Sequence, residues 1–295
     1  VDKLKAFVAT AQTGSFTAAA ALLGVSNRLT SKYVADLEAQ LGVRLFQRTT
    51  RKVGLTPAGE DLLARAPALL DDLDELLAEV SEGSRGLTGV IRIAAPVTFG
   101  EVYVAEMLGR FAQQNPDLTF DLRLHDGLTD LATDGIDIAF RIGKSEMLSL
   151  KARKLGEVTS MLVASPDYVA EHGAPETPKA LATYSCIVDT NRRRPRQWLF
   201  HLGTAEHDVT VEGRFNVNSA RAAVELAVAG LGLAYVPRFA LCDALASGSI
   251  VQVLEAYTGD SWPVSAVYLE GRALPRKVRA LIDFAVKDFA LAQGN

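Results

Sequence analysis

The chain of 295 residues has only two cysteines and no long apolar run. Cys186 and Cys242 are too few for a disulfide framework and are not spaced like metal ligands, so we expect small buried residues; redox activity of either stays open. No apolar run approaches the ~18–20 residues that span a membrane. Residues 1–12 mix charged and apolar positions, unlike a secretory signal. We therefore expect a cytoplasmic protein without membrane contact.

The motifs of common enzyme classes are also missing. The chain has no G-x-x-x-x-G-K-[ST] phosphate loop, no H-E-x-x-H zinc helix and no G-x-S-x-G nucleophile elbow. Gly230 and Gly232 lack the third glycine of a dinucleotide loop. The histidines form no cluster with metal-like spacing: His125, His172, His201 and His207. These absences favour a protein that is not an enzyme and that needs neither cofactor nor metal.

Charge is distributed unevenly along an otherwise ordinary globular composition. Hydrophobic residues make up 48% and charged residues 22% of the chain, and its length suits about two domains. Residues 1–60 carry eight Lys and Arg against four Asp and Glu, a net charge of +4, whereas residues 61–89 carry −5 and residues 90–295 carry −3. A basic segment on an acidic body indicates that only the first sixty residues meet a polyanion.

The first sixty residues have the pattern of a winged helix-turn-helix. Apolar residues recur at helical spacing in three segments separated by Gly14 and Gly24, and Ser15 and Ser26 are placed to cap the second and third segments. The residues of the third segment that we expect to face inward are Val34, Leu37 and Leu41. Two short β-prone runs around a cationic turn at 47–52 suit a hairpin wing.

The third helix carries the candidate DNA contacts, because the N-terminal half of this helix enters the major groove in a helix-turn-helix. Asn27 and Arg28 are able to read base edges. Residues better suited to phosphates are Ser26, Ser31 and Lys32. Wing residues that add backbone or minor-groove contacts are Arg48, Thr50, Arg51 and Lys52. The alternative interpretation is a solvated helical face with scattered charges.

Residues 57–80 are predicted to form one long helix, because Thr56 offers a cap and Pro57 suits the first helical position. Its apolar residues follow a 3.5-residue period that a single helix cannot bury in water: Leu62, Ala66, Leu69, Leu73, Leu76 and Val80. We expect this seam to pair with a second copy of the chain; the alternative is burial against its own domain. Pro67 should kink the helix.

Beyond a glycine- and serine-rich hinge at 81–89, strands alternate with helices. The expected strands are 90–94, 118–124, 136–140, 161–164, 186–188, 231–236 and 264–268. The expected helices are 101–114, 219–229 and 275–292. Such alternation is typical of a mostly parallel sheet covered by helices, arranged here as two α/β lobes.

The sequence resembles the LysR-type transcriptional regulators. In the first sixty residues the likeness runs in unbroken register through Ser31, Leu37-Glu38 and the segments 14–20, 23–26, 41–46, 48–51 and 55–59. It continues at 89–96, 137–143 and 230–237. Arg28 stands where that family often has proline, so the base contacts of this chain need not follow the common pattern.

The resemblance implies an α/β protein with an N-terminal winged helix-turn-helix, a long linker helix and a two-lobed effector domain similar to periplasmic binding proteins. The implied partners are double-stranded DNA, a small-molecule effector between the lobes, further copies in a homodimer or homotetramer, and RNA polymerase during activation. We divide the chain into residues 1–58, 59–88 and 89–295 accordingly. Within the last part, lobe I covers about 89–163 and 267–295, and lobe II covers about 164–266.

Candidate effector contacts lie where strands end and helices begin, because ligands of α/β lobes bind beyond the carboxyl ends of strands. They are Thr98, Phe99, Asp126, Arg141, Gly143, Asn218 and Ser219. Capping of their own helices is the alternative for Thr98, Asn218 and Ser219, and an ion pair with Asp137 is the alternative for Arg141. The densest basic cluster, 192–196, is interpreted as an exposed loop, with the effector mouth or a subunit contact as alternatives.

The sequence thus predicts a DNA-binding regulator whose operator binding or activation responds to a small molecule. The effector, the operator and target genes, and the sign of regulation are not encoded in any motif. A solute-binding protein would explain residues 90–295 but would leave the basic segment without a role. An enzyme on the α/β lobes would need motifs that the chain lacks.

Overall fold

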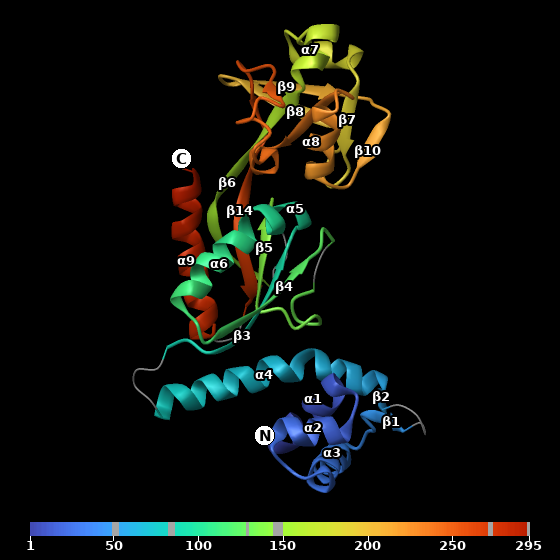
Figure 1. The fold of residues 1–295 in the computed structure, drawn as a ribbon, viewed down its shortest axis with the longest axis vertical. Coiled ribbons are helices and arrows are strands. Elements are labelled where there is room, and N and C mark those ends of the chain that lie inside the picture. Colours follow the sequence, from blue (N-terminus) through green and yellow to red (C-terminus); the bar gives the residue numbers. More distant parts are fainter. Residues whose placement is uncertain (49–52, 82–85, 128–129, 144–149, 271–273, 294–295) are drawn as a thin grey trace.

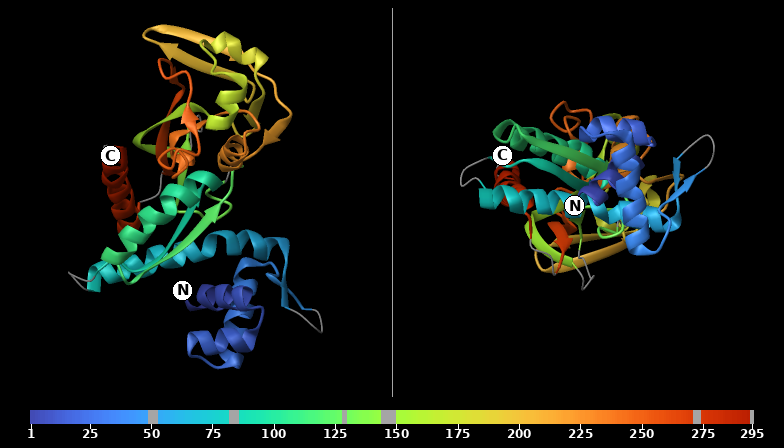
Figure 2. Two further views of the ribbon diagram at one scale, coloured as in Figure 1. Left: turned by 45° about the horizontal axis from the view of Figure 1, so that its top comes forward. Right: turned by 90° about the horizontal axis from the view of Figure 1, so that it is seen from below.

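The computed structural model describes residues 1–295 except 49–52, 82–85, 128–129, 144–149, 271–273 and 294–295. A small helical part lies on one side of the long helix α4 (Pro57–Ser81), and an elongated α/β part lies on the other (Figure 1). We call residues 1–56 the head and residues 89–293 the body. The turned view of Figure 2, left, shows the same order, with α4 between the head and the body.

The head is a unit of three short helices. They are α1 (Asp2–Thr13), α2 (Phe16–Leu23) and α3 (Asn27–Leu41). The Oγ atoms of Ser15 and Ser26 accept hydrogen bonds from the backbone N–H groups of Ala18 and Leu29, at 3.3 and 3.2 Å, so both predicted caps are confirmed. Small residues of α2 are buried in this unit, which lets its neighbours approach closely.

The core of the head contains Phe7 of α1 with Val34 and Leu37 of α3, all buried as their spacing requires. Leu41 is different, because 48% of it is exposed and the prediction that it faces inward is wrong. Leu41 is the last residue of α3, where the chain leaves the helix through the left-handed Gly42, and its side chain stays outside the core.

The wing of the head is an antiparallel hairpin of β1 (Phe46–Arg48) and β2 (Val53–Leu55). Phe46 pairs with Leu55 and Arg48 with Val53, which confirms the predicted hairpin. Three predicted wing contacts, Thr50, Arg51 and Lys52, lie outside the described residues, and so does the side chain of Arg48.

Helix α4 begins as predicted, since the Oγ1 of Thr56 accepts from the N–H of Gly59 at 3.1 Å. Pro67 lies inside the helix without ending it. Ala66 is fully buried and Leu62 packs against the core of the head, so the first part of the expected seam is used within the chain itself. Leu69 is 49% exposed and Leu73 is half-buried. The side chains of Leu76 and Val80 lie outside the described residues.

In the part of the body that the structure describes, nine strands form one sheet. Its strands are β3 (Gly89–Ala95), β4 (Leu118–Leu124), β5 (Ile138–Ile142), β6 (Leu150–Ala164), β7 (Cys186–Asp189), β10 (Phe215–Val217), β11 (Leu233–Pro237), β12 (Val251–Gln252) and β14 (Ser261–Leu269). Their order is β10-β7-β11-β6-β14-β5-β3-β4, and β12 pairs with β6. Lobe I contains β3, β4 and β5, and lobe II contains β7, β10 and β11 (Figure 1).

The sheet is parallel only within each lobe, which corrects the expectation of a mostly parallel sheet. The long strands β6 and β14 are antiparallel to their neighbours and join the two lobes. Residues 150–159 of β6 pair with β14, while residues 160–163 pair with β11 of lobe II. Val264–Val267 of β14 pair with β5 of lobe I, so β14 is lobe I structure several residues before the expected boundary at 267.

Helices and a small second sheet complete the body. In lobe I they are α5 (Val97–Phe99), a π-helical turn (Gly100–Val104), α6 (Ala105–Gln114) and α9 (Arg276–Gln293). In lobe II they are α7 (Pro166–His172), the 3₁₀ turns η2 (Pro178–Thr183) and η3 (Arg238–Leu241), α8 (Ala220–Val228), and a sheet of β8 (Gln197–Leu202), β9 (Ala205–Thr210) and β13 (Thr258–Gly259). Each lobe encloses its own apolar core.

Candidate DNA-binding surface and effector cleft

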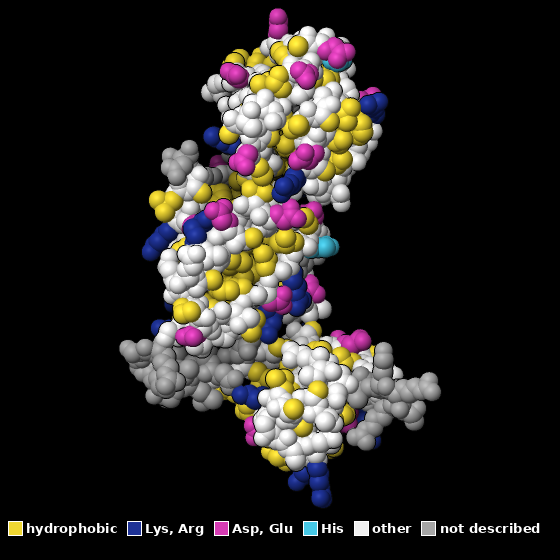
Figure 3. All heavy atoms as spheres, viewed as in Figure 1, with side chains coloured by type: hydrophobic (Ala, Val, Ile, Leu, Met, Phe, Trp, Pro, Cys, Tyr) yellow, Lys and Arg dark blue, Asp and Glu magenta, His cyan; other side chains and the backbone are white. Residues whose placement is uncertain are grey.

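The first turns of α3 present polar and cationic side chains to solvent. Ser26, Asn27, Arg28 and Lys32 are exposed, and Ser31 is half-buried. The Nδ2 of Asn27 donates to the Oγ1 of Thr17 in α2 at 3.2 Å, which holds this amide at the junction of the two helices. Lys and Arg side chains project from the tip of the head that is farthest from the body (Figure 3). The geometry leaves this face of α3 open to a large anionic partner.

A buried carboxylate fixes the start of the wing against α3. Glu38 is 8% exposed and accepts from the backbone N–H groups of Leu45 and Phe46 at 2.8 and 3.2 Å. Arg44 adds an ion pair at 3.0 Å. Burial opposes the charge of Glu38, but these three donors together hold its pKa below the usual value. Sequence patterns had assigned no role to Glu38.

The two lobes are joined by side-chain hydrogen bonds at the carboxyl ends of their strands. Asp126, just after β4, accepts from the N–H of Val97 at 2.9 Å through Oδ1 and from the Nδ2 of Asn191 at 3.1 Å through Oδ2. Asn191 follows β7 of lobe II, and its Nδ2 also donates to the carbonyl of Asn218. The structure therefore brings two predicted effector residues, Asp126 and Asn218, onto one bridging side chain that the sequence did not single out.

Phe99 belongs to the interior of lobe I and not to an open cleft. It is 1% exposed, and its ring lies 5.2 Å from those of Tyr103 and Phe239. Its aromatic neighbours already cover the ring, so the side chain packs in the core, and its role as an effector contact stays a prediction. Phe239 comes from η3 of lobe II, so this pair is an apolar contact between the lobes.

The other predicted effector residues lie around the same strand ends. Thr98 is 8% exposed at the start of the helix that follows β3. Gly143 directly follows β5, has a φ of 102° and donates its N–H to the carbonyl of Pro263 at 2.8 Å. Ser219 caps α8 by accepting from the N–H of Ala222 at 3.3 Å. Ser219 therefore already has the capping role that was its alternative.

Arg141 is half-buried on β5, and burial lowers its pKa. The alternative partner of Arg141, Asp137, accepts from the backbone N–H of Arg92 at 2.8 Å. In return, the backbone N–H of Asp137 donates to the carbonyl of Arg92 at 2.9 Å. Asp137 thus connects the chain just before β5 to β3.

Arg192 is not part of an exposed loop, which corrects that interpretation for the first residue of the basic cluster. Its side chain is 12% exposed, lies 4.4 Å from the ring centre of Tyr235, and donates to Ser160 and Asp260 at 3.1 and 3.0 Å. Ser160 lies on β6 and Asp260 immediately precedes β14, so Arg192 joins the lobe II ends of both crossing strands. Burial raises the pKa of Asp260, and the charge of Arg192 opposes that rise.

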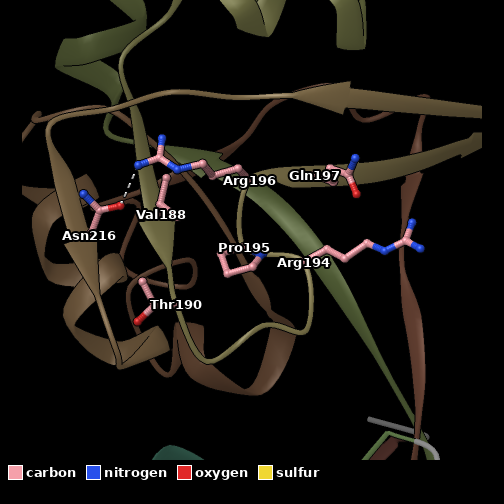
Figure 4. A pocket seen from close by; sticks show the side chains of 7 residues that line it. All are labelled: Val188, Thr190, Arg194, Pro195, Arg196, Gln197 and Asn216. Atoms are coloured by element: carbon pink, nitrogen blue, oxygen red, sulfur yellow. Dashed lines mark hydrogen bonds between the residues drawn. The ribbon is translucent and has the colours of Figure 1, made fainter.

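Arg193, Arg194 and Arg196 of the cluster are exposed, and Arg194, Pro195 and Arg196 border a groove of about 370 Å³ beside β7. Arg196 turns towards β10 and donates to the Oδ1 of Asn216 at 3.1 Å, while Arg194 points in the opposite direction (Figure 4). Val188 and Pro195 give the lining of this groove an apolar part.

The two cysteines differ in their surroundings. Cys186 is fully buried, as expected, and burial raises the pKa of its thiol to about 12. Cys242 is exposed, so the expectation of burial is wrong there. Cys242 directly follows η3 and has a φ of 45°, in a turn that directs its side chain to the surface.

Two family models together match nearly the whole chain. Residues 1–60 match the bacterial regulatory helix-turn-helix protein of the lysR family, and residues 84–290 match the LysR substrate binding domain. The chain belongs to the LysR family. It is a LysR-type transcriptional regulator, with a DNA-binding helix-turn-helix and a two-lobed domain for an effector.

Full-length relatives extend this likeness over both parts of the LysR chain. An uncharacterized HTH-type transcriptional regulator of Haemophilus influenzae is 34% identical over 95% of this chain and 99% of that protein. The regulator PtxR of Pseudomonas aeruginosa is 34% identical over 96% of this chain and 91% of its own length. The full-length structure of the Vibrio cholerae virulence activator AphB is 29% identical, covers 97% of this chain and 98% of that one, and has a TM-score of 0.61.

The described part of this LysR-type chain contains neither a metal-binding cluster nor a membrane-spanning helix. Among the residues whose positions are described, no three His, Cys, Asp or Glu side chains gather closely enough to hold a metal ion. Within that same part of the chain, none of the helices has the length and apolar character to cross a bilayer.

Proposed function

We propose that Asn27 and Arg28 of this regulator read base edges in the major groove of an operator. The observation that carries this proposal is that both side chains are exposed on the first turn of α3, behind a capped N-terminus. Contacts with phosphates would come from Ser26, Ser31 and Lys32, and from the wing residues Arg48, Thr50, Arg51 and Lys52. The protein acts on double-stranded DNA as a regulator and not as an enzyme, in the bacterial cytoplasm where the chromosome lies.

The effector lies between the lobes, near Thr98, Asp126, Arg141, Gly143, Asn218 and Ser219. Support comes from the position of these residues at the carboxyl ends of strands from both lobes, the usual place for ligands of α/β folds. Phe99, next to Thr98, belongs to the same predicted set, with its ring packed in the core.

The chain functions as a homodimer or homotetramer, divided into a DNA-binding part at 1–58, a linker at 59–88 and an effector part at 89–295. The dimer contact uses Leu69, Leu73, Leu76 and Val80 of α4. The exposure of Leu69 supports this role, because the burial of an exposed leucine against a second helix is favourable. During activation the assembly would also contact RNA polymerase.

Footprinting of the DNA upstream of the neighbouring transcription unit tests this function. We expect a protected region that contains two related half-sites, and an extract that holds the effector should alter the protection or the bend of the DNA. Absence of protection at low ionic strength, on every fragment offered and with or without extract, would contradict the proposal.

A further inference from the structure

Among the described residues, two contacts of different chemistry connect the lobes of the body. Phe99 and Phe239 form an apolar contact, with ring centres 5.2 Å apart. Asp126 and Asn191 form a polar one, at 3.1 Å, on exposed side chains. An exposed hydrogen bond is broken by water or by a ligand far more readily than a buried aromatic pair is separated. The polar contact is therefore the one suited to reversible opening.

Both ends of the polar contact are held firmly within their own lobes. On the lobe I side, Asp126 is tied to the N–H of Val97, and the neighbouring N–H of His125 donates to the carbonyl of Ala95 at 3.0 Å. On the lobe II side, the N–H of Asn191 donates to the Oδ1 of Asp189 at 3.0 Å. Because neither end is free to follow the other, movement between the lobes has to break the contact.

The Nδ2 of Asn191 uses its two hydrogens on two lobes. One goes to the carboxylate of Asp126 and the other to the backbone carbonyl of Asn218, which precedes α8. A hydrogen bond to a carboxylate is stronger than one between neutral groups. Asp126 and Asn218 are two of the proposed effector contacts. Both already accept a hydrogen bond from the side chain of Asn191.

We propose that Asn191 is a latch that holds lobe II against lobe I, and that an effector bound between the lobes has to replace or release it. Only the replacement by an effector rests on the proposed function. The latch itself concerns the distance between the lobes. An effector that takes the place of Asn191 has to offer a hydrogen-bond donor, such as a hydroxyl, amide or ammonium group, to the carboxylate of Asp126 and the carbonyl of Asn218.

A distance measurement in the full-length protein tests the latch directly. Spin labels at the exposed positions Gln113 of α6 and Glu225 of α8 report on the two lobes, in a Cys242→Ser background and with labelled chains diluted in an excess of unlabelled ones. We expect Asn191→Ala to raise the population of longer distances at least about tenfold, since it removes a hydrogen bond to a charged group. Asn191→Asp should do more, because it places a second carboxylate against Asp126.

An exchange of the two side chains separates a latch from a general loss of structure. Asp126 uses one oxygen for Val97 and the other for Asn191, so an amide at position 126 keeps the first bond and donates the second. The double variant Asp126→Asn with Asn191→Asp should therefore lie closer to the wild type than Asn191→Asp alone. Asn216→Ala, which removes an exposed amide of lobe II bonded to Arg196, should leave the distances unchanged.

The outcomes distinguish the latch from the proposed function. Longer distances in both Asn191 variants, with recovery in the double variant, support the latch even if no operator is ever bound. Unchanged distances in Asn191→Ala and Asn191→Asp overturn the latch, whether or not the protein binds DNA. Equal opening in Asn216→Ala also overturns it, since any loss of a polar contact in lobe II would then do the same.

Discussion

A β-carbon built on Gly135 of lobe I would lie 2.6 Å from the carbonyl oxygen of Ala64 in α4. The linker helix and the loop before β5 thus approach so closely that only glycine fits at position 135 without movement. A groove of about 490 Å³ lies around this approach and is lined by residues of the head, α4 and lobe I, among them Leu55, Leu63 and Arg92. The contact joins lobe I to α4, which itself packs against the core of the DNA-binding head.

Gly135→Ala should change operator affinity in the absence of effector by about fivefold or more, because α4 has to move away from lobe I. Gly135 has a φ of 64°, so the substitution also strains the backbone. Gly203→Ala is the matched control, since Gly203 has a φ of 61° and open space around it. Operator affinity is measured by fluorescence anisotropy. Equal affinities of the two variants would show that the contact with Ala64 does not affect DNA binding by the head.

Arg28→Ala should relax the preference for particular base pairs and cost about 1–3 kcal/mol of binding free energy at the cognate site. The physical reason is that a guanidinium on the first turn of α3 is able to make paired hydrogen bonds to guanine. Selection of bound sequences from a randomised pool measures this preference. An unchanged selected sequence would remove Arg28 from the base contacts.

Glu38→Gln should destabilise the head by about 1–3 kcal/mol near neutral pH, since it removes the charge that three donors stabilise. The native pKa of Glu38 is lowered, so this stability is present above the pKa of the unfolded chain and is lost as pH falls through the native value. Wild type and variant should therefore converge once the pH falls below the native pKa of Glu38. Hydrogen exchange of head peptides is the suitable measurement, because Trp198 and Trp262 both lie in the body.

The exposed Glu60 provides the matched control for this experiment. Glu60→Gln should leave hydrogen exchange in the head unchanged both near neutral pH and at acidic pH. A gap between Glu38→Gln and the wild type that stays constant down to acidic pH would mean that the charge of Glu38 does not contribute.

Leu69→Glu should weaken self-association by about tenfold or more, because the proposed dimer would have to bury a carboxylate in place of a leucine. Sedimentation velocity over a range of concentrations measures this. Leu291→Glu, at a residue of α9 that is 73% exposed, is the matched control and should associate like the wild type. Identical sedimentation of both variants would place the dimer contact elsewhere.

The head could be predicted from sequence because its signals are local. Ser15, Ser26 and Thr56 each accept from an N–H three residues ahead, so capping can be inferred from the neighbouring residues alone. The hairpin was equally evident from two short apolar runs. Leu41 was predicted wrongly, because helical spacing does not show where a helix extends beyond the core that it packs against.

The connection between the lobes could not be predicted in the same way. Most of β6 was missed since Lys151, Arg153 and Lys154 hide its period, and these residues are exposed on a strand that bridges two lobes. Arg192 is buried by Ser160 and Asp260, which are more than thirty residues away along the chain in either direction. Asn191 likewise depends on a partner 65 residues away. Long-range polar pairs of this kind leave no periodic signal in one sequence.

The salt dependence of binding to the footprinted operator tests the central claim, that the cationic head binds the backbone of duplex DNA, most directly. We predict that the logarithm of the association constant falls linearly with the logarithm of salt concentration, by about 0.9 per phosphate neutralised. Lys32→Ala should reduce this slope by about one, and Lys179→Ala, an exposed lysine of lobe II, should not change it. A slope near zero, or equal slopes for wild type and Lys32→Ala, would contradict the account.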